Sequence, residues 1–537
     1  MEDPKALAEF LVQANIRLVR AEFLWSLRER EELLPRRQEA ESLEFEHEGE
    51  KKSALATHDE IKEWGKDPAR ALLCSVSHCW ESREHPDPCG HQLHIIAESA
   101  LWHAAAYDAP VFLFIDYTSL FQYKRETGEQ HSFDLAMKQM HLLYCHECTF
   151  TLRVQSCTPQ SRWEELQNAG HQVHVYDDET GRVKQVELQK LERNQVPYLE
   201  RGWCQAELEW SSTRSASTSN RRIDADGGGP ERTSTCKVPT LPEKFKTQMR
   251  SMKFTHRSDE DAVFRLQEQM FTEKVTACRY ATFDHVGAEG ALALPEMLPR
   301  YVSLESLKLL NWEWDEAASE ALGFSLQQVL ARNILKELVI QFKGGIELEC
   351  KADSILLMSV AKALHGNSSL TSLRIVSDRT ILPRAWQASW QALAEAVKKT
   401  NARLIDVDVG KSFILRIFQL HYGGRADVAF LDQLKRTRLM LESNGLKPAA
   451  DALVGIETAC QRNASGSSTT ALRQTSQCVR PAVKSKDLEL QLQEGRTLPA
   501  LASPDVEALF WVVNKSRMVT IIHLRKIGKA GVALTKL

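Results

Sequence analysis

Three short apolar runs in the first half of the chain predict buried β-strands, at residues 71–77, 110–115 and 149–154. Two stretches of helical length separate them, at about 91–106 and 133–146. Strands that alternate with helices of about ten to fifteen residues are typical of a parallel sheet with helices on its faces. In such folds ligands bind beyond the carboxyl ends of the strands. The pattern therefore predicts an α/β domain and the edge of the sheet at which a site should lie.

A segment at 203–210 predicts a helix with a carboxylate on its apolar face. At about 100° per residue, the apolar arc of this helix consists of Trp203, Cys204, Ala206, Leu208 and Trp210. Glu207 falls within the arc, whereas Gln205 and Glu209 point to the outer face. Burial beside indole rings costs desolvation energy and raises the pKa of a carboxyl group, so such a group is either paired or part of a site. An ion pair with an arginine such as Arg201 and a functional carboxylate both remain open.

Motifs within residues 69–215 resemble the Toll/interleukin-receptor (TIR) domain. The first strand leads into a serine-containing loop, Cys-Ser-Val-Ser-His-Cys-Trp at 74–80, and the second ends in Phe-Ile-Asp at 114–116. The helix carries Trp-Cys-x-x-Glu-Leu at 203–208, which is the most specific of the three motifs. The resemblance implies a flavodoxin-like, TIR-type parallel sheet.

The same region is also similar to the fungal heterokaryon-incompatibility (HET) domain. Ser-His-Cys-Trp at 77–80 is similar to the opening motif of that family. Asp116 followed by Gln122, and Met140 followed by Tyr144, are similar to two further HET motifs. We therefore describe the region as TIR/HET-like.

In catalytic TIR domains the glutamate of this motif is essential for NAD cleavage, so the resemblance gives Glu207 that role. Breaking the nicotinamide–ribose bond builds positive charge on the ribose, which a nearby carboxylate stabilises. The residues expected to contact the ligand are Ser77, His78, Trp80, Asp116 and Trp203. NAD is then the substrate, and no metal or cofactor is required. The alternative is a non-catalytic interaction domain in which Glu207 is paired in the core.

An insertion at 155–198 separates the third strand from the Glu207 helix. Its runs at 171–176 and 183–188 flank a turn that contains Gly181, a pattern that predicts a β-hairpin. We expect this hairpin next to the site, as a lid over it or as an obstruction. The last strands of the family would fall beyond residue 212, where the sequence turns to linker, so a truncated sheet is expected.

Four phrases in the second half share the pattern Leu-x-x-Φ-x-Φ, where Φ is apolar, and begin at Leu304, Leu335, Leu370 and Leu404. Their starts are 31, 35 and 34 residues apart, with helical stretches between them. A strand and a helix per repeat resembles leucine-rich repeats of the ribonuclease-inhibitor type, although these spacings exceed the usual limit of about 29 residues. The resemblance implies a second α/β domain at 287–412 that binds protein partners. An ordinary α/β domain with chance periodicity is the alternative.

The other segments are expected to be connectors. Residues 1–68 are predicted to form an amphipathic docking helix and a charged, solvated arm. The remaining predictions are a flexible linker at 216–236, a helical connector at 237–286, a helical region at 413–463, a linker at 464–486 and an unassigned segment at 487–537.

Composition restricts the class of partner. The 537 residues carry a formal net charge of −4 and no basic block longer than a pair, so no nucleic-acid partner is expected. No apolar run reaches about eighteen residues and the N-terminus has no signal-peptide pattern, which predicts a cytoplasmic protein without a membrane span. Cys145-x-x-Cys148 has no second pair to complete a zinc pattern, so no metal site is expected.

These features predict a cytoplasmic TIR/HET-like signalling or defence protein. In the first reading, residues 69–215 cleave NAD and self-associate, coupled to a recognition module of leucine-rich-repeat-like units. In the second, the same domain and the repeats form a non-catalytic protein-interaction scaffold. Exposure of Glu207 would favour the first reading, and an arginine paired with it the second.

Overall fold

The structure of the chain is a computed structural model. It describes residues 2–225, 236–254, 259–312, 315–342 and 351–377, a few residues between 388 and 396, and strands between 406 and 536. The chain divides into two compact units, Met1–Trp314 and Asp315–Leu537, and each is described by itself. The helical region predicted at 413–463 and the linker predicted at 464–486 lie outside the described residues.

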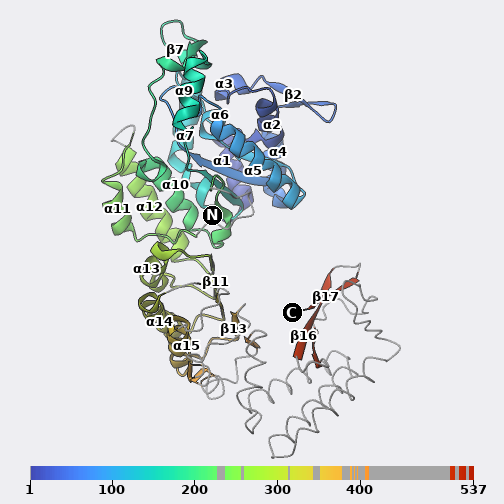
Figure 1. Cartoon of the computed structure of the whole chain (residues 1–537), viewed down its shortest axis with the longest axis vertical. Helices are drawn as coiled ribbons and strands as arrows, with labels where there is room; N and C mark the ends of the chain where they lie inside the picture. The colour runs from blue at the N-terminus through green and yellow to red at the C-terminus, as the bar shows by residue number, and fades with distance from the viewer. Residues whose placement is uncertain are drawn as a thin grey trace, which may run out of the picture. The chain divides into compact units, whose positions relative to one another are not determined.

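The first unit is coloured from blue to yellow in Figure 1. A five-stranded sheet forms its centre, in the order β1-β5-β4-β6-β9. Its strands are β1 (Val19–Arg20), β4 (Leu72–His78), β5 (Val111–Phe114), β6 (Thr149–Val154) and β9 (Asn220–Arg222). Strands β5, β4, β6 and β9 are mutually parallel, and β1 runs antiparallel to β5 at the edge. The three strands predicted from the apolar runs and the α/β class are confirmed.

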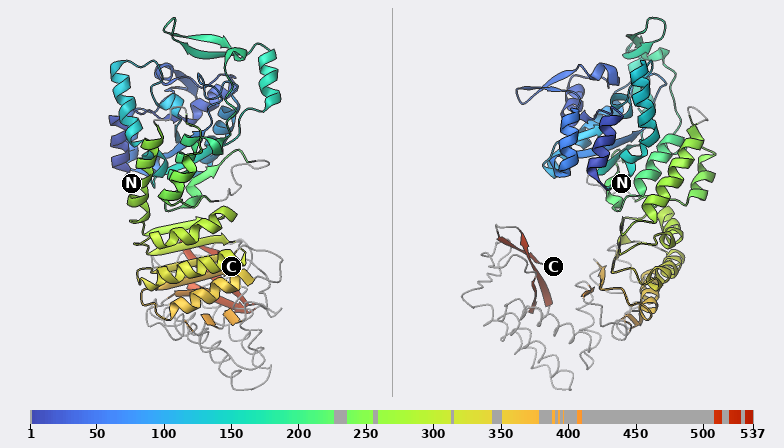
Figure 2. Two further views of the ribbon diagram at one scale, coloured as in Figure 1. Left: turned by 90° about the vertical axis from the view of Figure 1, so that its left-hand side faces the viewer. Right: turned by 180° about the vertical axis from the view of Figure 1, so that it is seen from behind.

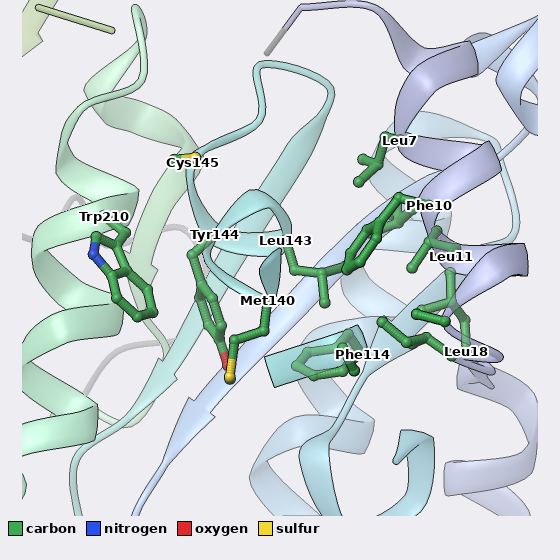
Figure 3. Packing of buried hydrophobic residues seen from close by; sticks show 14 of the residues in the cluster. Leu7, Phe10, Leu11, Leu18, Phe114, Met140, Leu143, Tyr144, Cys145 and Trp210 are labelled. Carbon is green, nitrogen blue, oxygen red and sulfur yellow. The ribbon is translucent and has the colours of Figure 1, made fainter. Parts of the chain in front are cut away.

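Helices cover both faces of this sheet. Successive side chains of β4 point to opposite sides, so this strand contributes residues to a hydrophobic layer on each face. Leu73 belongs to one hydrophobic layer, part of which is seen in Figure 3. That layer also contains buried residues of α1 (Pro4–Gln13), α4 (His58–Lys66), α7 (Thr127–Gln139), α8 (His141–Cys145) and α10 (Gly202–Ser212). Cys74 and Val76 lie in the opposite layer. That layer contains residues of α2 (Ala21–Glu29) and α5 (His91–Tyr107).

The N-terminal segment is part of the first unit and not a separate docking helix and arm. Its elements are α1, β1, α2, α3 (Arg37–Ala40), β2 (Glu44–His47), β3 (Glu50–Ser53), α4 and η1 (Pro68–Arg70). The apolar stripes of α1 and α2 pack in the two hydrophobic layers, and β1 extends the sheet. The boundary predicted at residue 68 is therefore wrong, because an amphipathic stripe in the sequence does not say what it packs against.

The prediction of a flexible linker at 216–236 is also wrong for residues 217–222. Residues 217–222 form η4 (Ser217–Ser219) and strand β9, which pairs with β6. Asn220 of β9 accepts a hydrogen bond from Arg153 Nε at 2.7 Å and donates one to Ser211 Oγ at 2.7 Å. The polar residues of this segment suggested exposure to solvent, but Asn220 forms its hydrogen bonds inside the fold. The sheet also has a further strand here, whereas a truncated sheet was expected.

The predicted hairpin is confirmed. It consists of β7 (Gln172–Asp177) and β8 (Arg182–Glu187), which pair antiparallel after α9 (Gln160–Asn168). Gly181 in the turn has a φ of 66°, which favours glycine. A small cluster of Trp163, Val173, Val175, Leu188 and Leu191 supports the insertion. Two 3₁₀ turns, η2 (Leu188–Lys190) and η3 (Tyr198–Glu200), lead from it to α10.

The first unit ends in helices and two more strands. Helices α11 (Pro242–Met249) and α12 (Asp259–Val275) pack against each other, and α12 also packs on α10. They fall within the predicted helical connector. The remaining elements are β10 (Tyr280–Asp284), α13 (Ala288–Met297), η5 (Leu298–Arg300) and β11 (Ser306–Trp312). Strands β10 and β11 pair in parallel.

The second unit contains parallel strands at the spacing of the repeat phrases. Its described elements are α14 (Glu316–Ala331), β12 (Glu337–Phe342), α15 (Lys351–Leu364), β13 (Ser372–Ser377) and β14 (Asp406–Val409). Strand β13 pairs in parallel with β12 and with β14, and α14 packs beside α15 (Figure 2). The four phrases coincide with β11, β12, β13 and β14, and Leu307, Leu338 and Leu373 are buried. The side chain of Val407 lies outside the described residues.

A three-stranded antiparallel sheet near the C-terminus occupies part of the segment left unassigned. It consists of β15 (Ala508–Val513), β16 (Val519–Ile527) and β17 (Gly531–Lys536). Across the described part of the chain, every helix is too short or too polar to cross a membrane.

Candidate functional site

Polar side chains gather at the carboxyl ends of β4 and β5. Ser77 and His78 are the last residues of β4, and Trp80 follows in the loop. Asp116 comes two residues after β5 and begins the short helix α6 (Asp116–Ser119). Glu207 reaches the same region from α10, as its bond to Ser77 shows. The structure thus brings together five of the residues predicted from the sequence.

Glu207 and Ser77 form the inner half of the site. The Ser77 hydroxyl donates a hydrogen bond to Glu207 Oε2 at 2.6 Å and lies 2.6 Å from the Tyr198 hydroxyl. Tyr198 also donates to the carbonyl oxygen of Cys204 at 3.3 Å. Glu207 is only 8% exposed, so this carboxyl group sits in a closed polar network at the end of the sheet.

Burial dominates the electrostatics of Glu207. Desolvation, and to a lesser extent the negative charge of Asp116, raise the pKa of Glu207 to about 8, although hydrogen bonds from Ser77 and Tyr144 act in the opposite direction. At neutral pH this carboxyl group is therefore mostly protonated, and it ionises in the mildly alkaline range. A pKa near neutrality is a property of many catalytic acids and bases.

The ion pair between Glu207 and Arg201, one of the two alternatives that the sequence left open, is not formed. The Arg201 guanidinium instead donates to three carbonyl oxygens, those of Trp80 at 2.6 Å, Val196 at 2.7 Å and Asn194 at 3.2 Å. Arg201 therefore ties the insertion and the loop after β4 to the start of α10. Arg201 is thus engaged by carbonyl oxygens and does not compensate the charge of Glu207.

His78, Trp80 and Asp116 form the outer half of the site. Asp116 Oδ1 lies 3.2 Å from His78 Nε2, and Asp116 Oδ2 accepts a hydrogen bond from Trp80 Nε1 at 2.9 Å. The Asp116 side chain is 31% exposed, against 2% for His78. Asp116 is therefore more open to a ligand than Glu207.

The orientation of Gln92 fixes the proton on one ring nitrogen of His78. Gln92 Nε2 donates to the carbonyl oxygen of Cys79 at 2.8 Å and to Glu81 Oε1 at 3.0 Å. Gln92 Oε1 must then accept, so His78 Nδ1, at 2.9 Å, carries a proton. His78 Nε2 faces the Asp116 carboxylate and also needs a proton to make a favourable contact. Both ring nitrogens thus face acceptors, which favours the imidazolium form of His78.

The pKa values of His78 and Asp116 agree with this arrangement. Burial disfavours the charge on His78, but the hydrogen bond and charge of Asp116 outweigh it and raise the pKa of His78. Burial likewise opposes ionisation of Asp116, yet the contacts with His78 and Trp80 lower its pKa. At neutral pH the site thus contains an ionised Asp116 and a mostly neutral Glu207, and the charge of Asp116 favours the cationic form of His78.

Trp203 does not join this group and instead lies in the hydrophobic layer. It is half-buried and makes an edge-on contact with Trp210, with 6.3 Å between ring centroids. Its place in the motif is therefore explained by packing of α10. The role predicted for Trp203 in ligand binding is not supported by this position.

The environment of Glu209 differs from the one predicted for it on α10. The helical pattern placed Glu209 on an outer face, but its side chain is buried. It accepts hydrogen bonds from Thr240 N at 2.5 Å and Thr240 Oγ1 at 2.9 Å, and Lys237 Nζ lies 3.5 Å away. Because α12 and the segment at 237–240 cover this side, α10 has no outer face at Glu209.

Three residues of the site were not predicted from the sequence. Tyr144 stood in the Met-x-x-x-Tyr phrase but was given no role, and nothing around Tyr198 or Gln92 marked either residue. Their contacts join segments that are distant in sequence, such as Ser77 and Tyr198. Within the described residues, no group of three His, Cys, Asp or Glu side chains is arranged to hold a metal ion.

Fold and site together define an α/β protein with a polar cluster at the carboxyl ends of its parallel strands. Comparison of the chain with protein-family models, with curated proteins and with solved structures found no match.

Proposed function

We propose that the first unit contains a TIR/HET-like domain that cleaves NAD at the bond between nicotinamide and ribose. The observation that carries this proposal is the state of Glu207. It lies at the carboxyl ends of parallel strands, is bonded to Ser77, is not paired with Arg201, and has a pKa of about 8. The Trp-Cys-x-x-Glu-Leu, Phe-Ile-Asp and serine-loop motifs support the same assignment.

The chemistry requires negative charge beside the ribose. As the bond to nicotinamide breaks, its electron pair leaves with nicotinamide and positive charge develops on the ribose. Water then adds to the ribose carbon and releases one proton, which gives ADP-ribose. Asp116 supplies a partly exposed carboxylate, and Glu207 supplies a second negative charge when it is ionised.

Consumption of NAD by the full-length chain tests the proposal. The wild type should release nicotinamide, and Glu207→Gln, which keeps the shape of the side chain, should lower kcat by about a hundredfold or more. Glu200→Gln is a matched control, because Glu200 is exposed and lies just before α10. Equal turnover by the wild type and Glu207→Gln would contradict the assignment, as would an inert wild type.

The repeat phrases support the second part of the proposal. They place leucines at regular intervals on parallel strands, and Leu338 and Leu373 are buried at equivalent positions of β12 and β13. We propose that this region is a leucine-rich-repeat-like module that binds protein partners. The whole protein would then act in signalling or defence in the cytoplasm, with its NAD-cleaving domain active on self-association.

The small exposure of Glu207 favours a second candidate function. A buried glutamate whose carboxyl oxygens accept hydrogen bonds from Ser77 and Tyr144 has partners within the protein and needs no substrate to explain it. In this case the TIR/HET-like domain and the repeats form a protein-interaction scaffold. An inert wild type, together with a loss of folding stability in Glu207→Ala, would support the scaffold.

A further inference from the structure

Arg153 lies at the carboxyl end of β6, next to Ser77 of the Glu207 site. The two residues are paired in register on adjacent parallel strands, which lie about 4.8 Å apart. Residues paired in this way project to the same face of a sheet, and the bond from Ser77 to Glu207 shows that this is the face covered by α10. The Arg153 side chain therefore extends into the layer that contains Glu207.

Only one end of the Arg153 guanidinium is engaged. Arg153 is 5% exposed, and its Nε atom donates to Asn220 Oδ1 at 2.7 Å. Asn220 in turn donates to Ser211 of α10, so this contact holds the guanidinium between the sheet and the helix. Nη1 and Nη2 of Arg153 form no hydrogen bond with the residues that the structure describes, and unlike the nitrogens of Arg37 they retain accessible surface. Two charged donor groups are thus open to a ligand.

The carboxylate that acts on Arg153 is engaged elsewhere. Asp224 accepts hydrogen bonds from Arg222 Nε at 2.9 Å and from the backbone N–H of Gln155 at 2.8 Å. Burial is the main cause that lowers the pKa of Arg153, and Arg222 lowers it further, whereas Tyr198 and Asp224 oppose the change. The positive charge of Arg153 is therefore poorly solvated, and an anionic ligand would compensate it.

The sheet topology makes β4 and β6 the strands at which a ligand is expected. The connection from β4 to β5 contains α5, in one hydrophobic layer, whereas the connection from β6 to β9 contains α10, in the other. Adjacent strands whose connections run to opposite faces form a topological switch point, where open α/β sheets bind ligands beyond the carboxyl ends of the strands. Ser77 and Arg153 are paired across this point.

We infer that Arg153 binds the pyrophosphate of the dinucleotide and so orients it in the Glu207 site. The identity of this ligand rests on the proposed NAD cleavage. A guanidinium presents its N–H donors in a planar fork that matches phosphate oxygens. Asp116, which follows β5 on the other side of β4, supplies the opposite charge about two strand spacings, or about 10 Å, away. The two charges hold the pyrophosphate on the β6 side and the adjoining ribose on the β5 side, where positive charge develops during cleavage.

Calorimetric titration of the full-length chain with ADP-ribose tests this inference without cleavage. ADP-ribose keeps the pyrophosphate but has no bond to nicotinamide. Arg153→Gln should weaken its binding by about tenfold to a hundredfold, the effect of losing charged hydrogen bonds. Arg153→Lys keeps the charge but loses the planar fork, so its effect should be intermediate. Arg221→Gln is the matched control, because Arg221 of β9 lies over the Trp102 ring of α5, on the opposite face of the sheet.

Inorganic pyrophosphate gives a readout that needs no variant. It should displace ADP-ribose from the wild type, and this competition should be lost in Arg153→Gln. If the chain cleaves NAD, Arg153→Gln should raise KM with little change in kcat, because the pyrophosphate is not at the bond that breaks. A structural role of Arg153 alone would not produce this split.

Three results would overturn the inference. They are no binding of ADP-ribose by the wild type, no competition by inorganic pyrophosphate, and equal binding of ADP-ribose by the wild type and Arg153→Gln. Binding that depends on Arg153 in a chain that does not cleave NAD would support the inference and contradict the proposed cleavage. Cleavage without a role for Arg153 would do the reverse.

Discussion

His78 and Asp116 form an ion pair across the ends of two neighbouring parallel strands, with His78 Nε2 3.2 Å from Asp116 Oδ1. The histidine is nearly inaccessible, and the aspartate is partly open. Gln92 Oε1 accepts a hydrogen bond from the other ring nitrogen, and this bond, together with the charge of Asp116, favours the cationic form of His78. The site therefore presents a fixed negative charge through Asp116, which His78 and Trp80 position.

Replacing Asp116 with Asn should change the charge of His78. The counter-charge that raises the pKa of His78 is lost while burial remains, so we expect this pKa to fall. The neutral form of His78 would then predominate down to a lower pH than in the wild type. Imidazole nitrogen chemical shifts followed by NMR across pH 4 to 9 measure the change. Asp108→Asn, at an exposed position after α5, should leave the titration of His78 unaltered.

Stability should decrease with rising pH because of Glu207. The folded-state pKa is about 8, against 4.5 for the ordinary group, so the folded protein binds a proton that the unfolded chain has lost. Stability therefore falls between about pH 4.5 and 8, by about 1.4 kcal/mol per pH unit at most. The raised pKa of His78 acts in the same direction above pH 6.5.

Urea unfolding of the wild type and Glu207→Gln between pH 5 and 9 measures this effect. The glutamine cannot ionise, so its stability relative to the wild type should increase steadily as the pH rises towards 8. A difference between the two proteins that stays constant over this range would show that Glu207 has an ordinary pKa.

Local sequence patterns predicted those elements whose burial is set by neighbours along the chain. The apolar runs at 71–77 and 149–154 became β4 and β6, and the turn at Gly181 became the tip of a hairpin. The patterns failed where burial depends on distant segments. Glu209 is covered by residues 237–240 and α12, which helical periodicity of α10 alone cannot indicate.

The candidate site was predictable in part for the same reason. Ser77, His78 and Asp116 end strands, and parallel strands bring their carboxyl ends together. Tyr198 and Gln92 reach the site from a loop and a helix whose places are set by tertiary packing. Arg37 shows most clearly what the sequence could not predict. It lies in a charged run that was expected to be solvated, but its side chain is buried.

Removing the Tyr198 hydroxyl should affect Glu207 through Ser77. Tyr198→Phe loses the contact with Ser77 Oγ and the bond to the Cys204 carbonyl, so we expect a loss of about 1 to 3 kcal/mol in the free energy of unfolding. If the domain cleaves NAD, the pH at which kcat is half-maximal should also move, because Ser77 is then free to reorient. Tyr176→Phe in the hairpin is the comparison variant. A normal pH profile in Tyr198→Phe would assign this tyrosine to packing alone.

Gly202 should not tolerate a side chain at the start of α10. A Cβ atom there would lie 2.3 Å from Cζ of Phe254, and the Gly202 N–H is fixed by a 2.9 Å hydrogen bond to the carbonyl oxygen of Lys253. Gly202→Ala should therefore destabilise the first unit by about 1 to 3 kcal/mol, the usual cost of overpacking. Urea unfolding measures it. The double variant Gly202→Ala/Phe254→Leu should recover part of the loss, whereas additive losses would place the strain elsewhere.

Leu373 should be essential to the parallel sheet of the second unit. It is buried in β13, where it is paired in register with Leu338 of β12 and Val407 of β14. Leu373→Asp places an unpaired carboxylate in this core, and we expect a loss of about 3 to 5 kcal/mol in the free energy of unfolding. Leu373→Met, which nearly preserves volume, should cost less than about 1.5 kcal/mol. Limited proteolysis with denaturant unfolding distinguishes the two variants. Equal stability of Leu373→Asp and the wild type would mean that the repeat phrases do not form the core of this sheet.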